Sequence, residues 1–387
     1  MFYIDKSVKD ELSIREMTKS ELLFFSDMAS AYQHGYCYLC GDIESLDYLS
    51  EHLGKPFNSI YNLVKNRYAE NGEVIRIVSK VCVLTFQEEL SLNMLPEILQ
   101  KKDKSIFISI QLVITQNIKL NRPCSLIGEN LTDCKFYKIV AKHYFYKHNI
   151  EKLNLNFHLE NGGGDPTCEV LKKVIESDKT LTLCIVDSDR SYGLSKEYPN
   201  KPHDGNTLKH VRDVSKSLPK LPPHEVYPLH VHEIENLIPF KILQQIMEEQ
   251  LPDMEAGLKF LKELQEINDG EPVLYYDFKN GFPYMKEKAK QAYWKNILLK
   301  LGKDNLKMPP ETKKEAEQEA KQDNQLVTFP SLSRNKLLEK ANGILKIKSI
   351  SEKENMQKSI DGYLDTYWDE IGLLMLTWGC ANLPVYA

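Results

Sequence analysis

The alternation of strand-like and helix-like segments between residues 122 and 240 constrains the fold of this 387-residue chain more than any other feature. Three apolar, strand-like segments, "CSLIGEN", "LNLNFHLE" and "LTLCIVDSD", alternate with "TDCKFYKIVAKHYFYKH" and "TCEVLKKVIES", whose apolar residues have helical spacing. Such alternation predicts a parallel sheet with right-handed helical crossovers. We therefore expect the α/β class, with chemistry at the carboxyl ends of the strands.

A pair of aspartates follows the third of these segments. Residues 181–186 are almost all apolar, which is typical of a strand buried on both faces, and Asp187 and Asp189 come directly after them. In an extended backbone both side chains would point to the same side, and their hard oxygens suit Mg²⁺ or Mn²⁺. Asp-x-Asp is also common in turns that follow strands, so the pair alone does not distinguish a metal site from a turn.

Two other segments contribute acidic pairs. Glu129 ends the first strand, and Asp133 begins the next helix, which it would cap. The segment "LHVHEIENLIP" alternates like a strand, with Glu233 and Glu235 on one side. Each pair alone could be a cap, a turn or a solvated edge, but three pairs in this order predict a metal site.

Histidines and cysteines give weaker signals. His230 and His232 share the other side of that expected strand, where structural histidines are commoner than ligands. In "HGYCYLCG", His34, Cys37 and Cys40 have metal-like spacing, but no second Cys-x-x-Cys pair completes a zinc site. We expect the eight cysteines to be reduced thiols, several of them in the core.

The sequence suggests three domains, at 1–118, 119–240 and 241–387. In the first, a mixed α/β module, Thr18 and Glu21 form a capping box, and "GEVIRIVSKVCVLTF" and "SIFISIQLVITQNI" resemble strands. The third is mainly helical and should pack on the second. Its polar segment 303–325 suggests a solvated helix or mobile insert, and the apolar segment from Ser359 to the end should pack onto a core.

Composition narrows the function classes. The sequence has no apolar run of 18 residues and no signal peptide at its first residues, so we expect a cytoplasmic protein without a membrane partner. The net charge of −5 gives no overall attraction to nucleic acid, although a local basic channel is compatible with it. No Gly-x-x-x-x-Gly-Lys-Ser/Thr loop is present, so we expect no ATPase activity in this chain.

The order of the acidic motifs resembles the Toprim domain of type IA topoisomerases, primases, small RNA maturases and overcoming-lysogenization-defect (OLD) nucleases. That family has a glutamate after its first strand and Asp-x-Asp after its third. The matching positions here are Glu129, Asp187 and Asp189, and Gly162, Gly163 and Gly164 lie where many OLD-like members carry glycines. Glu233 and Glu235 resemble the further acidic element of OLD-like and stand-alone antiphage nucleases. The usual second glycine of the first motif is Asn130 here.

The resemblance implies a Rossmannoid parallel sheet and a nuclease that uses Mg²⁺ or Mn²⁺. Two ions about 4 Å apart would be held by Glu129, Asp133, Asp187, Asp189, Glu233 and Glu235, activating water and stabilising the leaving oxygen. Glu129 would serve as ligand or as general acid or base. Lys279, in "YYDFKNG", would stabilise transition-state charge or be an ordinary surface lysine in a hairpin.

The resemblance also implies a nucleic-acid substrate, DNA or tRNA, and a possible partner ATPase that holds an antiphage effector inactive. A homo-oligomer is compatible with it. Topoisomerase or primase chemistry is an alternative, but the sequence offers no identifiable active-site tyrosine domain or nucleotide-binding module. A Toprim scaffold that binds protein or nucleic acid without cutting is the non-enzymatic alternative. Crowded like charges without a metal argue against it.

Overall fold

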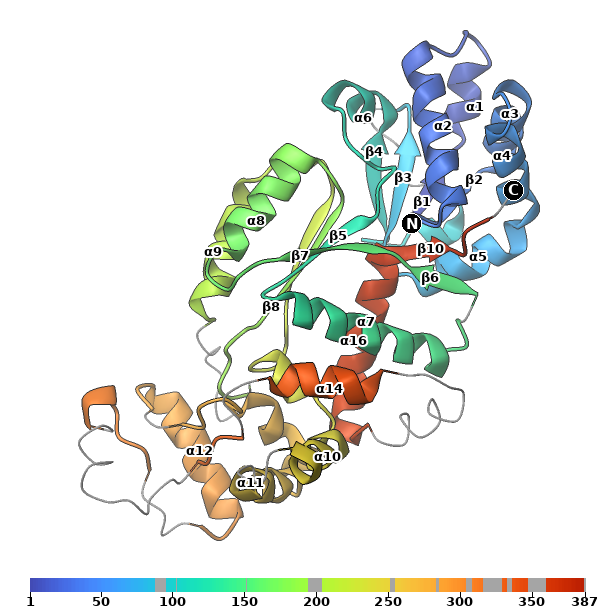
Figure 1. Ribbon diagram of the computed structural model, residues 1–387. Coiled ribbons are helices and arrows are strands. Elements are labelled where there is room, and N and C mark those ends of the chain that lie inside the picture. Colours follow the sequence, from blue (N-terminus) through green and yellow to red (C-terminus); the bar gives the residue numbers. More distant parts are fainter. Residues whose placement is uncertain are drawn as a thin grey trace. The chain divides into compact units, whose positions relative to one another are not determined.

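The computed structural model describes most of the chain and divides it into two compact units (Figure 1). The described residues are 1–87, 95–101, 103–150, 152–193, 204–250, 255–282, 285–303, 308–315, 329–332, 336–346 and 360–385. The first unit comprises Met1–Cys184, Asp213–Val226 and Glu370–Ala387, and the second comprises Ile185–Arg212 and Tyr227–Asp369. Each unit is described by itself below.

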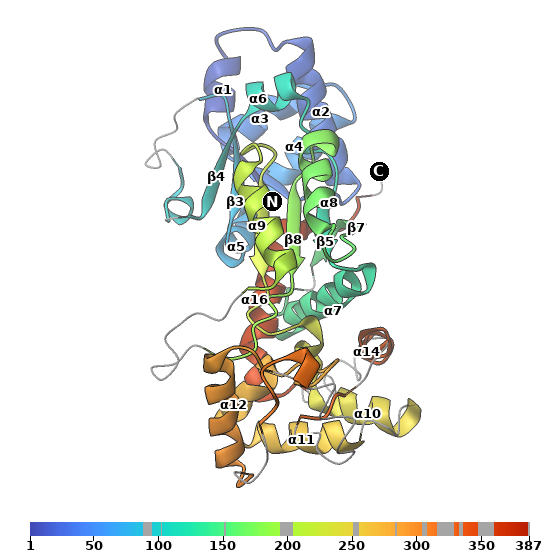
Figure 2. The same ribbon diagram turned by 90° about the vertical axis from the view of Figure 1, so that its left-hand side faces the viewer.

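A parallel four-stranded sheet organises the N-terminal part of the first unit. Its strands are β1 (Phe2–Ile4), β2 (Leu39–Gly41), β3 (Val81–Thr85) and β4 (Ser105–Ser109), in the order β2-β1-β3-β4. The helices of this part are α1 (Ser7–Leu12), α2 (Lys19–Gln33), α3 (Ile43–His52), α4 (Phe57–Asn66), α5 (Tyr68–Ile77) and α6 (Ile110–Gln116). Figure 2 shows α1, α2, α3 and α6 together beside β3 and β4.

Local signals explain where these elements begin and end. The predicted capping box is confirmed, because Thr18 Oγ1 accepts from Glu21 N at 3.3 Å and Glu21 Oε2 accepts from Thr18 N at 2.8 Å. The two predicted strands are only half correct, since "GEVIRI" lies in α5 and "IQLVITQ" forms α6. The β-branched residues in these runs are compatible with short helices once tertiary packing buries one face, and Ser109 caps α6.

A second four-stranded sheet has the order β7-β5-β8-β9. Its strands are β5 (Cys124–Gly128), β7 (Phe157–Asn161), β8 (Thr182–Val186) and β9 (His224–Pro228), and β5 pairs in parallel with both β7 and β8. Between them lie α7 (Leu131–Lys147), α8 (Thr167–Lys173) with a π-helical turn Val174–Asp178, and α9 (Asn206–Ser217). The predicted α/β class with parallel sheets is therefore confirmed.

The predicted strand "LNLNFHLE" is two strands. Asn156 separates β7 from β6 (Leu153–Leu155), and β6 pairs antiparallel with β10 (Cys380–Asn382) near the end of the chain. This pairing agrees with the expectation that the apolar C-terminal segment packs onto a core.

Helices dominate the region after residue 239, as predicted. They are α10 (Phe240–Gln250), α11 (Glu255–Gln265), a 3₁₀ segment (Asn268–Tyr275), α12 (Lys288–Lys300), α14 (Leu337–Leu345) and α16 (Gly362–Gly379). Most of the polar segment 303–325 lies outside the described residues, so its prediction is tested only at 303 and 308–315, where a short helical turn occurs. None of the helices described is both long and apolar enough to span a bilayer.

The units do not follow the predicted boundaries at 118/119 and 240/241. In the first unit, one hydrophobic core joins Tyr3 and Val83 of the N-terminal sheet to Phe145 of α7 and to Leu376 and Cys380 near the C-terminus. Polar contacts connect the same parts, because Lys80 lies 2.6 Å from a Glu225 oxygen that also accepts from Trp378 Nε1 at 2.9 Å. The N-terminal module and much of the second predicted domain therefore belong to one unit.

Candidate functional site

In the first unit, Glu129 follows β5 and lies against the glycine segment. Gly163 N donates to the Glu129 backbone oxygen at 2.7 Å, and Gly162 N donates to the Gly128 oxygen at 2.8 Å. A Cβ on Gly162 would stand only 2.7 Å from that Gly128 oxygen. The absence of a side chain at Gly162 thus permits this close approach of the two backbone segments.

Asp133 forms a hydrogen bond at the start of α7 that the sequence did not predict. The N-cap is Asn130, and Asp133 occupies the third helical position, where its Oδ2 accepts from Asn130 N at 2.8 Å. The residue is 4% exposed. The expectation that Asp133 is the cap was therefore wrong, because the helix begins three residues earlier.

In the second unit, Asp187 and Asp189 lie beyond the end of β8 and differ in backbone conformation. Asp187 Oδ1 accepts from Ile234 N at 3.1 Å. Asp189 has φ +54°, in the left-handed region, and its N–H donates to the His232 oxygen at 2.9 Å. A Cβ on Gly205 would overlap the Asp189 carboxylate, so that carboxylate lies against Gly205. Strand alternation therefore does not apply to this pair, because the strand ends at Val186 and the backbone at Asp189 is not extended.

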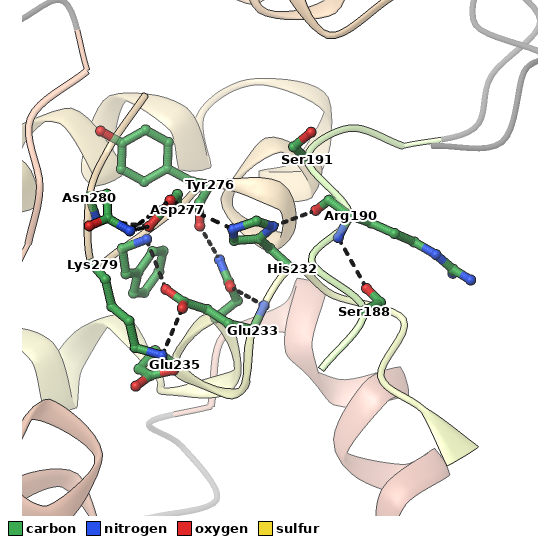
Figure 3. A network of polar contacts seen from close by, with 12 residues as sticks. Ser188, Arg190, Ser191, His232, Glu233, Glu235, Tyr276, Asp277, Lys279 and Asn280 are labelled. Carbon is green, nitrogen blue, oxygen red and sulfur yellow. Dashed lines mark hydrogen bonds and ion pairs between the residues drawn. The ribbon is translucent and has the colours of Figure 1, made fainter. Parts of the chain in front are cut away.

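Glu233 and Glu235 converge although the predicted strand is absent. The strand β9 ends at Pro228, Glu233 caps a 3₁₀ turn over Ile234–Leu237, and Glu235 lies within it. Lys279 Nζ lies 2.9 Å from Glu233 Oε2 and 3.2 Å from Glu235 Oε2 (Figure 3). These three side chains form an acidic–lysine cluster. Lys279 is in a turn, Asp277–Gly281, closed by Gly281 N donating to the Asp277 oxygen at 2.8 Å, rather than in a hairpin.

Burial makes this cluster electrostatically unusual. The side chains of Glu233 and Glu235 are 7% and 10% exposed, whereas that of Lys279 is 48% exposed. Burial, together with the neighbouring Glu235 charge, raises the pKa of Glu233 from 4.5 to about 7. Burial alone would lower the pKa of Lys279, but the two carboxylates outweigh it and raise that pKa. Among the described residues, no group donates a hydrogen bond to Glu235 Oε2, whose charge is offset by the Lys279 ammonium at 3.2 Å.

Two residues that the sequence analysis did not select support the cluster. Asn236 Oδ1 accepts from Glu233 N at 2.9 Å, and its Nδ2 donates to the oxygens of Val273 and Tyr276 at 2.7 and 2.8 Å. Asp277 Oδ1 accepts from Asn280 N at 2.8 Å. The spacing Asp-x-x-Asn-Gly in "DFKNG" is a turn signal that points to Asp277, whereas no local pattern identifies Asn236.

His232 ties three segments of the second unit together. Its Nδ1 donates to the Arg190 oxygen at 2.9 Å, and its Nε2 lies 3.9 Å from Asp277 Oδ2. Burial lowers the pKa of His232, but Asp277 and the other nearby carboxylates outweigh it, so that the pKa is raised. Figure 3 shows the Arg190 side chain extending away from the cluster while its backbone oxygen meets the ring. His230 is exposed and packs edge-on against Tyr227.

The donor chemistry of the cluster fits a hard divalent cation, although the ligand geometry is not assembled. Two carboxylates already share one cation, the Lys279 ammonium, and carboxylate oxygens are what Mg²⁺ and Mn²⁺ prefer. Across the described residues, no group of three or more His, Cys, Asp and Glu side chains is arranged so that it could hold an ion. In the first unit, Cys37 and Cys40 are buried thiols, whereas His34 is exposed.

Comparison with models of protein families, with curated proteins and with solved structures found no match.

Proposed function

We propose that this protein is a metal-dependent nuclease that hydrolyses phosphodiester bonds with Mg²⁺ or Mn²⁺. The observation that carries the proposal is the pair of buried carboxylates, Glu233 and Glu235, which lie 2.9 and 3.2 Å from the Lys279 ammonium. Ile234, between them, donates its N–H to Asp187 Oδ1 at 3.1 Å. Carboxylates gathered after strands of a parallel α/β sheet are typical of sites that bind metal and phosphate.

The residues of the second unit suggest a division of roles. Glu233, Glu235 and Asp187 would hold the cation, which when bound lowers the pKa of water and screens phosphate charge. Lys279, released from one carboxylate, would offer its ammonium to a phosphate oxygen. Asp189, fixed in the left-handed conformation against Gly205, would contribute a further carboxylate. In the first unit, the Toprim resemblance implies a ligand or acid–base role for Glu129, and the position of Asp133 four residues later suggests a ligand role for it.

The substrate and partner remain part of this proposal. The resemblance to antiphage Toprim effectors favours DNA or tRNA as the polymer and an ATPase as a regulatory partner, since the sequence contains no phosphate-binding loop of its own. The cytoplasm is the compartment where both nucleic acids and such a partner are present.

A cleavage panel tests the proposal. The purified chain is incubated with Mn²⁺ or Mg²⁺ and supercoiled plasmid, single-stranded DNA or total tRNA, beside Glu129→Ala, Asp187→Ala and the control Asp213→Ala. Asp213 is 75% exposed in a surface ion pair. We expect one polymer to be cut, with a loss of at least about 100-fold in the first two variants and none in the third.

A binding scaffold without catalysis is the second candidate, and one observation favours it. Lys279 balances one of the two carboxylate charges, and the raised pKa of Glu233 favours its neutral form, so the crowded carboxylates do not by themselves require a metal. Thermal stability separates the candidates, because a metal site gains melting temperature with Mn²⁺ and Asp187→Ala abolishes that gain. Equal melting curves with and without Mn²⁺, together with no cleavage of any polymer, would support the scaffold.

A further inference from the structure

Asn236 stands out in the second unit as a fully buried polar side chain whose three hydrogen bonds all go to backbone groups. It is 0% exposed, with its amide nitrogen on the Val273 and Tyr276 oxygens and its amide oxygen on Glu233 N. A buried amide with both donor hydrogens and its acceptor engaged holds its partners in one geometry, because breaking any bond leaves a buried polar group unsatisfied.

These bonds connect the two segments that build the acidic–lysine cluster. One segment carries Glu233 and Glu235, and the other leads through Tyr276 into the turn that carries Lys279. A further bond continues the connection, since Glu233 Oε1 accepts from Phe278 N at 3.1 Å. The distance between lysine and carboxylates therefore depends on how these two backbones are held together.

We propose that Asn236 is a positioning residue that sets the separation of Lys279 from Glu233 and Glu235 and thereby the affinity of these carboxylates for a divalent cation. The inference on metal affinity rests on the proposed function, whereas the inference on geometry does not. Asn236 is fully buried and bonds only to backbone groups, so it would contact neither the cation nor the substrate. It acts as outer hydrogen-bonding groups do at metal sites, by fixing the orientation of ligand-bearing backbone.

Two substitutions distinguish the hydrogen bonds that the Asn236 side chain donates from the one that it accepts. Asn236→Asp keeps the shape and the acceptor for Glu233 N but loses both donated bonds, and Asn236→Ser keeps one small donor should the first variant fail to fold. The matched control is Asn71→Asp in the first unit. Asn71 is likewise buried, accepts from Tyr38 Oη at 2.8 Å and donates to the Val64 oxygen at 3.0 Å.

The first measurement needs no metal and tests the geometry. Hydrogen–deuterium exchange of the peptide covering 276–281 is compared with that of peptides from α11, at equal distance below each variant's melting temperature. We expect exchange in 276–281 to rise at least about tenfold in Asn236→Asp, less in Asn236→Ser and not at all in Asn71→Asp. Unchanged exchange in both Asn236 variants would overturn the inference.

The second measurement detects a role beyond stability. The loss of the free Mn²⁺ electron paramagnetic resonance signal gives the affinity, which we expect to weaken about 10- to 100-fold in the Asn236 variants and to stay at the wild-type value in Asn71→Asp. Wild-type affinity in folded Asn236 variants overturns the positioning role. If the wild-type chain itself binds no Mn²⁺, the proposed function fails and the exchange result alone decides the geometric claim.

Discussion

The pH dependence of stability offers a direct test of the acidic–lysine cluster, through the substitution Glu233→Gln. The pKa of Glu233 is about 7 in the folded chain against an ordinary 4.5, because the carboxyl group is buried beside Glu235. A folded pKa above the unfolded one means that the native state binds more protons between these values. The protonated Glu233 therefore contributes to the unfolding free energy at low pH, and this contribution is lost as the pH rises from 4.5 through 7.

The magnitude follows from this shift. A rise from 4.5 to about 7 corresponds to a loss of about 2–3 kcal/mol of unfolding free energy between pH 5 and pH 8 from this one group. Glutamine keeps an acceptor for Phe278 N but does not titrate. Between pH 5 and pH 8, we therefore expect the wild type to lose about 2–3 kcal/mol more unfolding free energy than Glu233→Gln.

Urea unfolding followed by circular dichroism, at pH 5 and pH 8 without divalent cations, measures the difference. Glu21→Gln is the control, since Arg15 bonds to Glu21 at 2.7 and 2.9 Å and lowers its pKa to about 2. Its contribution is lost only as the pH falls below 4.5, so its penalty should be constant between pH 5 and pH 8. Parallel pH profiles for wild type and Glu233→Gln would refute the reasoning.

Three further predictions concern packing. Gly205→Ala should displace the Asp189 carboxylate and weaken Mn²⁺ binding about tenfold in a thermal-shift titration, and an unchanged titration contradicts this. Gly72 lies in α5, and among the described residues no atom outside this helix lies within 4 Å of an added Cβ. Gly72→Ala should therefore raise the unfolding free energy by about 0.5–1 kcal/mol, and a lower unfolding free energy in urea contradicts this. Trp378→Phe removes a hydrogen bond to Glu225 and should cost about 1 kcal/mol, and wild-type stability contradicts this.

The parallel α/β architecture could be predicted because its signals are local and periodic. The apolar run before Asp187 and the helical spacing from Leu131 to Lys147 each report burial of one chain segment, and both elements occur where expected. The errors occurred where β-branched residues lie in helices, in α5 and α6. Ser109 begins α6 inside a segment whose composition favours a strand, and only tertiary packing decides between the two.

The acidic residues of the candidate site could be selected from the sequence, but their geometry could not be predicted from it. Glu233 and Glu235 were selected on a strand pattern that does not exist, and they converge because both lie at a 3₁₀ turn facing Lys279. Side-chain alternation requires an extended backbone, whereas Asp189 with φ +54° departs from it one residue after Ser188. Period-two reasoning is therefore valid within a strand and fails just beyond its end, where functional side chains usually lie.

Asn236 illustrates why the supporting residues were harder to find than the charged ones. A carboxylate can be noticed in a sequence because its desolvation must be compensated by something, whether a lysine, a metal or a hydrogen bond. Asn236 bonds only to backbone groups, one at the nearby Glu233 and two at Val273 and Tyr276, 37 and 40 residues away. A backbone carbonyl is not a partner that the sequence identifies by residue type. Its importance depends on which carbonyls the fold brings to it. The charges of this cluster are thus encoded locally, whereas the separation of Lys279 from the two carboxylates is encoded by the fold.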